Sequence, residues 1–145
     1  RTFSKAAGLA SLRLGYLLAH PELATELKKT QLPYAVNTFS RVAALAACRH
    51  YDEIREQAQD IVREKDSLYE RMSELEGVRP FPSETNFILF QTNNTEQTFQ
   101  SLLSQNILVR KFNSILNRGC FLRVTIGTPT MNKLFLDALR TACEK

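Results

Sequence analysis

The stretch Arg1-Thr2-Phe3-Ser4-Lys5-Ala6-Ala7-Gly8-Leu9, followed by Leu12-Arg13-Leu14-Gly15-Tyr16, decides how this sequence is interpreted. It places a lysine beside two hydroxyl side chains, with an arginine a short distance along the chain. The hydroxyls and the guanidinium are donors suited to a phosphate group, and a shielded lysine can attack an aldehyde. The pattern indicates a phosphate-bearing aldehyde cofactor. On spacing alone, a solvated lysine in a loop of small residues is the simpler interpretation, because short motifs recur by chance.

The composition excludes several classes of protein. The chain has 145 residues, 43% hydrophobic and 23% charged, as in globular proteins, and we predict no membrane span because no apolar run approaches about 20 residues. The net charge is +4, but basic and acidic residues are interleaved, which argues against a nucleic-acid surface. Cys48, Cys120 and Cys143 lack metal-site spacing, so we predict no metal and reduced cytosolic thiols.

Periodicity divides the chain into a leading segment and an α/β layer. The apolar run Leu14 to Ala19 predicts a buried strand, and Pro21 opens a short helix. The stretch Gln31 to Thr38 has no periodicity and predicts an extended connector. We therefore expect a domain boundary there, with residues 1–38 before it and residues 39–145 after it.

Beyond the connector, apolar spacings alternate between helical and strand periods. The predicted helices are Phe39 to Tyr51, Asp52 to Glu76, one capped by Thr95, and one from Thr128-Pro129 that buries Leu134, Phe135, Ala138 and Leu139. The predicted strands are Thr85 to Gln91, Ile107 to Phe112 and Phe121 to Ile126. This order indicates an α/β fold in which helices cover a small sheet.

Three polar residues adjoin the predicted strands. Arg123 interrupts the apolar run Phe121 to Ile126, and its charge could be met by a ligand carboxylate or by a structural Asp or Glu. Arg110 ends an apolar run, where a solvated charge is the simpler interpretation. Asn86 is a candidate ligand contact at a strand entry, although a turn residue bonding its own backbone is the simpler alternative.

These residues form part of an ordered series of motifs. Besides residues 1–16, the series comprises Pro33-Tyr34-Ala35-Val36-Asn37, Ser83-Glu84-Thr85-Asn86-Phe87, Ile107-Leu108-Val109-Arg110 and Leu122-Arg123-Val124-Thr125-Ile126-Gly127. The series covers essentially the whole chain and resembles the fold-type I pyridoxal-phosphate-dependent aminotransferases, most closely the histidinol-phosphate aminotransferase family. The resemblance implies the pyridoxal-phosphate-dependent transferase fold. Residues 1–38 would end the large cofactor-binding domain and form the connector, and residues 39–145 would form the small C-terminal domain.

The resemblance also implies roles for individual residues. Lys5 matches the lysine that forms a Schiff base with pyridoxal 5'-phosphate and moves a proton between substrate Cα and cofactor C4′. Thr2, Ser4 and Arg13 match ligands of the cofactor phosphate. Arg123 matches the arginine that clamps the substrate carboxylate.

Substrate specificity rests on two further matches in the resemblance. Arg110 matches the arginine that helps to bind the phosphate of histidinol phosphate or the distal carboxylate of the amino acceptor, and Asn86 is expected to contact substrate.

The activity implied by the family is transfer of an amino group between histidinol phosphate and 2-oxoglutarate, giving imidazole acetol phosphate and glutamate, in histidine biosynthesis. The implied enzyme is a cytoplasmic homodimer. In the family, residues that hold the cofactor ring precede the cofactor lysine, so we expect the chain by itself to lack activity. Alternatives within the family are a threonine-phosphate decarboxylase and an aromatic aminotransferase. From another class, the alternative is a non-catalytic structural or binding domain.

Overall fold

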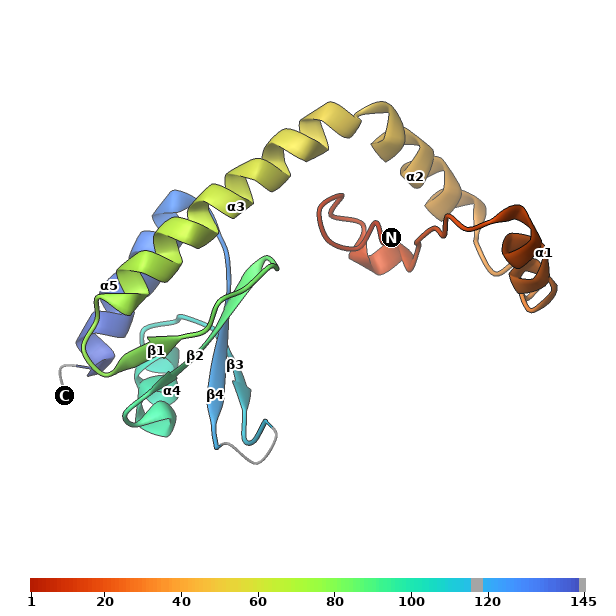
Figure 1. The fold of residues 1–145 in the computed structure, drawn as a ribbon. Helices are drawn as coiled ribbons and strands as arrows, with labels where there is room; N and C mark the ends of the chain where they lie inside the picture. The colour runs from red at the N-terminus through yellow and green to blue at the C-terminus, as the bar shows by residue number, and fades with distance from the viewer. Residues whose placement is uncertain (116–118, 144–145) are drawn as a thin grey trace. The chain divides into compact units, whose positions relative to one another are not determined.

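The chain folds into two compact units, Arg1–Ala58 and Gln59–Lys145, in a computed structural model that describes residues 1–115 and 119–143. The division falls within helix α3 (Tyr51–Ser73), which is labelled in Figure 1. The domain boundary expected after residue 38 stays a prediction. None of the helices in the described ranges is long and apolar enough to cross a membrane.

The first unit opens with a loop that folds back on itself. Thr2 pairs with Gly15 as an isolated antiparallel bridge, and the Phe3 amide donates to the Leu14 carbonyl at 3.1 Å. A Cβ on Gly15 would lie 2.6 Å from the Arg1 carbonyl oxygen, so the two arms approach closely only because this residue is glycine. A short 3-10 helix, η1 (Ala10–Leu12), lies within the loop.

The buried strand predicted for Leu14 to Ala19 is wrong. Within the described residues, its pairing is limited to the bridge at Gly15, and Leu17 and Leu18 are 63% and 86% exposed. A strand needs a hydrogen-bonded neighbour along its length, and within the described residues the backbone bonds of this run reach only Leu14 and Tyr16, on either side of the bridge.

The two helices predicted next are confirmed, as α1 (Pro21–Lys29) and α2 (Thr38–Arg49). Asn37 caps α2, because its Oδ1 accepts the Ser40 amide at 2.8 Å. The buried Ser40 hydroxyl donates to the Leu12 carbonyl at 2.9 Å, which ties α2 to the opening loop.

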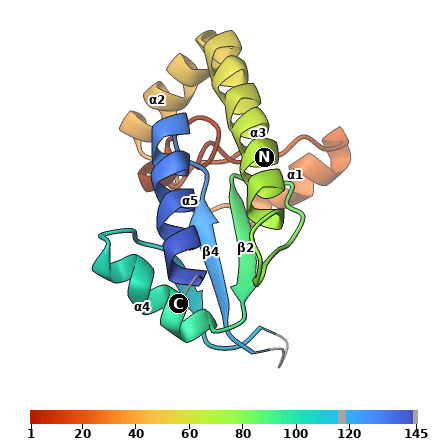
Figure 2. The same ribbon diagram turned by 90° about the vertical axis from the view of Figure 1, so that its left-hand side faces the viewer.

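The second unit is built on a four-stranded antiparallel sheet in the order β1-β2-β4-β3. Its strands are β1 (Val78–Pro80), β2 (Phe87–Thr92), β3 (Arg110–Phe112) and β4 (Phe121–Thr125). The end of α3, α4 (Thr95–Ser104) and α5 (Pro129–Cys143) contribute to one core with the sheet. Figure 2 shows α3 and α5 in front of β2 and β4. The helices therefore cover one face of the sheet.

The three predicted strands are confirmed as shorter strands, and β2 ends one residue beyond the predicted Gln91. The strand β1 was not predicted, because a three-residue strand leaves little pattern. Asn94, and not Thr95, caps α4 by accepting the Gln97 amide at 3.1 Å. In α5, Leu139 is fully buried as predicted, but Leu134 is 57% exposed. Its neighbour Phe135 is buried as predicted, and the two adjacent residues cannot both face the core, since a helix rotates by about 100° per residue.

This difference within α5 gives a matched test of the core. In the full-length protein, Leu139→Ala should lower the free energy of unfolding by about 2–5 kcal/mol, because it leaves a cavity in a closed core. Leu134→Ala should change it by less than about 1 kcal/mol. Urea unfolding of both variants measures the difference, and equal losses would contradict the observed orientation of α5.

Candidate functional site

The central strand β4 carries the most unusual charge of the second unit. Leu122 and Val124 are buried against the helices, so the alternation along the strand turns Arg123 to the opposite face. Arg123 pairs directly with Leu89 of β2 on one side and with Arg110 of β3 on the other. Residues opposite one another in an antiparallel pair share a face. Two predicted ligand residues are thus neighbours.

Both arginines lack acidic partners within the described residues. The Arg123 guanidinium lies 4.6 Å from the Phe87 ring centre, and that of Arg110 lies 5.0 Å from the Phe112 ring centre. The Arg123 Nε is buried and has no hydrogen-bond partner in the part of the chain that the structure describes. Like charges placed opposite one another repel, and a buried donor without a partner costs free energy. An anionic ligand would relieve both effects.

The neighbouring cation on β3 shows the contrast. Lys111 Nζ donates to both carboxylate oxygens of Glu96, at 2.7 and 3.0 Å. This hydrogen bond holds the pKa of Glu96 below its usual value. Lys111 is therefore satisfied by the protein itself, whereas the buried Nε of Arg123 on the adjacent strand has no hydrogen-bond partner among the described residues.

Asn86 lies directly before β2, at the end of the sheet where β4 finishes. Its carbonyl accepts the Ile126 amide at 2.9 Å, and the next residue, Phe87, is the ring that Arg123 covers. The structure thus brings Asn86, Arg110 and Arg123 into one region of the second unit.

The other predicted residues share the opening loop of the first unit. Thr2 Oγ1 accepts the Ser4 amide at 3.0 Å and lies 3.5 Å from the Leu14 carbonyl oxygen. Arg13 has a left-handed φ of 51°, and its Nη1 donates to the Ala10 carbonyl at 3.1 Å. These bonds fix the loop and leave most of the Arg13 donors unused.

Lys5 is exposed at the turn of this loop. Its carbonyl accepts the Gly8 amide at 2.9 Å, which fixes the backbone. Its ammonium has no hydrogen bond or ion pair with any residue that the structure describes. The side chain is therefore available to an external group.

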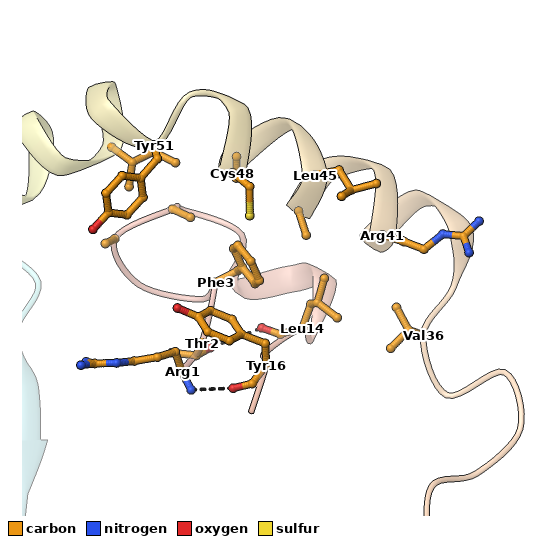
Figure 3. Close-up of a pocket in the computed structure, with 15 residues that line it drawn as sticks. Arg1, Thr2, Phe3, Leu14, Tyr16, Val36, Arg41, Leu45, Cys48 and Tyr51 are labelled. Atoms are coloured by element: carbon orange, nitrogen blue, oxygen red, sulfur yellow. Dashed lines mark hydrogen bonds between the residues drawn. The ribbon is translucent and has the colours of Figure 1, made fainter. Parts of the chain in front are cut away.

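An apolar groove of about 780 Å³ lies between the loop and α2. Figure 3 shows Phe3, Tyr16 and Leu45 among its lining residues, and the rings of Phe3 and Tyr16 are 5.7 Å apart. Thr2 also lines the groove, but Lys5 and Arg13 do not. The groove therefore shares Thr2 with the predicted cofactor ligands but not Ser4, Lys5 or Arg13.

Two contributors to these sites were not predicted. Phe87 supports Arg123, and its place on the same sheet face could be deduced only from the register of β2 against β4. Ser40 holds the loop by its hydrogen bond to Leu12. Its position one helical turn before the buried Ala44 could have indicated that its hydroxyl is buried as well.

The family is shown by comparison with known proteins. Residues 1–139 match the model of the class I and II aminotransferases. The chain belongs to this family, and the predicted α/β transferase fold is confirmed. Histidinol-phosphate aminotransferase of Aquifex aeolicus is 38% identical over 141 residues, which are 96% of this chain and 40% of that protein.

Solved structures agree. Histidinol-phosphate aminotransferase of Sinorhizobium meliloti, in complex with pyridoxal-5'-phosphate, matches 99% of this chain and 40% of its own with a TM-score of 0.80 and 27% identity. L-threonine-O-3-phosphate decarboxylase of Porphyromonas gingivalis matches 99% of this chain and 46% of its own, with a TM-score of 0.77 and 28% identity. The chain spans about 40% of the length of the curated relatives it matches.

The chemistry of the loop fits pyridoxal phosphate. The cofactor presents a phosphate, which needs several N–H or O–H donors, and an aldehyde, which needs an amine. Arg13 and the Ser4 hydroxyl retain free donors, and the Lys5 amine has no competing partner among the described residues. Thr2 would have to exchange its long contact with Leu14 for a phosphate oxygen.

If Arg123 serves a ligand, its replacement should not destabilise the ligand-free protein. In the full-length protein without substrate, Arg123→Met should leave the free energy of unfolding unchanged or raise it by up to about 1 kcal/mol, because it removes a like-charge contact. Lys111→Met on the adjacent strand should lower stability, because it leaves Glu96 without its partner. Thermal unfolding in ligand-free buffer compares them, and a strong loss for Arg123→Met would show that Arg123 is structural.

Proposed function

We propose that this chain forms part of a longer pyridoxal-phosphate-dependent aminotransferase that transfers an amino group between histidinol phosphate and 2-oxoglutarate. The observation that carries the proposal is the cross-strand pair of Arg110 and Arg123, in which the buried Nε of Arg123 has no hydrogen-bond partner among residues 1–115 and 119–143. Such a pair suits substrates that carry phosphate or carboxylate groups. Family membership and the names of the relatives support the same reaction.

Lys5 has two roles in this proposal. Pyridoxal phosphate, when bound, supplies an aldehyde and a ring that accepts electrons from the substrate Cα. The Lys5 Nζ would hold the aldehyde carbon covalently and, once displaced by the substrate amine, would move a proton between Cα and C4′. Ser4, Thr2 and Arg13 would hold the phosphate by hydrogen bonds, which fixes the cofactor against the lysine.

The second unit would select the substrate. Arg123 would bind a carboxylate through two parallel N–H donors, including the Nε that has no partner among the described residues. Arg110 would bind the phosphate of histidinol phosphate or the distal carboxylate of 2-oxoglutarate. Asn86 would orient the bound substrate at the edge of this site.

Three wider features also belong to the proposal. The parent enzyme would be a homodimer in the cytoplasm, as the resemblance implies. The 145-residue chain alone would lack transaminase activity, because it spans about 40% of the length of its curated relatives and the resemblance implies that the cofactor-ring ligands lie elsewhere in the parent enzyme. Normal turnover by the isolated chain would contradict this part.

The second candidate is a decarboxylase of the same family. The close match to the P. gingivalis threonine-phosphate decarboxylase favours it, because the same arginine pair would bind an amino-acid phosphate. Incubation of the full-length protein with histidinol phosphate and 2-oxoglutarate should produce glutamate. Release of carbon dioxide from threonine phosphate, without glutamate formation, would support the decarboxylase, and phenylalanine as the preferred donor would support an aromatic aminotransferase. No product from any substrate would favour a non-catalytic domain.

Removal of the Lys5 amine tests its covalent role. In the full-length protein, Lys5→Ala should abolish the visible absorbance of the lysine-bound cofactor and lower kcat by about 10³-fold or more, because both attachment and proton transfer are lost. Lys28→Ala, on the exposed face of α1, is the control and should retain both. Survival of the absorbance band in Lys5→Ala would exclude Lys5 as the attachment point.

Arg110→Ala tests specificity. The variant should weaken binding of histidinol phosphate by about 10- to 100-fold, since a charge-assisted hydrogen bond contributes about 1.5–3 kcal/mol. Phenylalanine, which has no phosphate, should be affected much less. Steady-state KM values for both donors measure the ratio, and equal effects would remove Arg110 from the specificity argument.

A further inference from the structure

A buried asparagine holds the backbone where β4 leaves the sheet. Asn132, in the first turn of α5, is 5% exposed. Its Oδ1 accepts the Gly127 amide at 2.9 Å, and its Nδ2 donates to the Gly127 carbonyl at 3.1 Å. One side chain thus satisfies both backbone groups of a residue just beyond the sheet, as a neighbouring strand would.

Glu64, on α3, fixes the orientation of this amide. Asn132 Nδ2 donates to Glu64 Oε2 at 2.8 Å. A carboxylate only accepts hydrogen bonds, so it selects the NH₂ side of the asparagine and leaves Oδ1 facing Gly127. The close approach also needs glycine, because a Cβ on Gly127 would lie 2.9 Å from the Met131 Cβ.

The clamped residue adjoins the candidate carboxylate site. Ile126, directly before Gly127, donates its amide to the Asn86 carbonyl at 2.9 Å. Phe87 follows Asn86, pairs with Thr125 of β4, and carries the Arg123 guanidinium over its ring. A shift of the chain at Gly127 would therefore move the Asn86 backbone and the Phe87 ring on which Arg123 rests.

We propose that Asn132, oriented by Glu64, is a positioning residue for the carboxylate-binding site formed by Arg123 and Asn86. The inference rests on the proposed function of Arg123. Asn132 acts through the Gly127 backbone and the end of the β2–β4 ladder. Its effect should therefore appear in the affinity for carboxylates more than in the proton-transfer step.

The test uses the full-length enzyme with its cofactor and glutarate, a dicarboxylate with no amino or oxo group. The dissociation constant is measured from the rise in unfolding temperature with glutarate concentration. Asn132→Ala should weaken glutarate binding by about tenfold, the factor that corresponds to loss of roughly 1.4 kcal/mol. In turnover, KM for 2-oxoglutarate should rise by a similar factor, and kcat should change by less than about threefold.

Variants of Glu64 keep the proposal testable if Asn132→Ala does not fold. Glu64→Gln retains an acceptor oxygen and should bind glutarate like the wild type, whereas Glu64→Leu should weaken binding. Asn94→Ala is the structural control, because it removes a helix-capping asparagine from α4 in the same unit. It should lower the unfolding temperature without changing glutarate affinity.

Arg123→Met tests the carboxylate site separately from the positioning role of Asn132. If it weakens glutarate binding while Asn132→Ala and Glu64→Leu do not, the positioning role is wrong and the function of Arg123 stands. If Arg123→Met leaves binding unchanged, the proposed carboxylate site is wrong and the positioning role is overturned with it. Equal weakening by Asn94→Ala and Asn132→Ala would also overturn it, because general destabilisation would then explain the effect.

Discussion

The alternation of side chains along β4 is the constraint on which the second unit depends. Leu122 and Val124 are buried in the core beneath the helices, so Arg123, which lies between them on the strand, faces the opposite side of the sheet. A slip of one residue would bury Arg123 and expose the two apolar side chains, so the core enforces the register. Because β4 pairs with both β2 and β3, the same register sets Arg123 opposite Leu89 and Arg110. The hydrophobic core thus determines the geometry of the candidate anion site.

That geometry is unfavourable without a ligand, and the rest of the unit offsets its cost. The two guanidinium groups rest on aromatic rings, which supply cation–π attraction but no hydrogen-bond acceptor for the buried Nε. Nearby polar groups are satisfied, as Lys111 with Glu96 and Asn132 with Glu64 show. Among the buried side-chain atoms that the structure describes, the donor left without a partner is the Nε of Arg123. An anion bound at this site would accept a hydrogen bond from the Nε and offset the repulsion between the two arginines. The free energy that this arrangement costs the ligand-free protein would therefore favour anion binding.

Local pattern predicted most of the helices and strands but not the relations between them. The charge of Arg123 within an apolar run was visible in the sequence, whereas its pairing with Arg110 depends on the register of β3 against β4, which the sequence pattern does not determine. Leu134 and Leu139 both fit a helical apolar stripe, and only the packing of α5 against the sheet distinguishes them. The run after Leu14 is apolar enough for a strand, but strand formation depends on a partner that hydrophobicity does not reveal. Roles in cofactor binding came from the resemblance, and no pattern in the sequence pointed to Asn132.

The two groups of candidate residues are supported by different physics. Arg110 and Arg123 lie on strands backed by a closed apolar core, so their backbone positions are rigid. The loop that carries Lys5 and Arg13 has few buried residues beneath it, and backbone hydrogen bonds, the bond from Ser40 and the close approach at Gly15 hold it. A substrate clamp must discriminate between anions, which a rigid sheet favours. In the proposed function, Lys5 would alternate between covalent attachment and proton transfer, and an exposed side chain on a loop held by hydrogen bonds would permit this change of position while the backbone stays fixed.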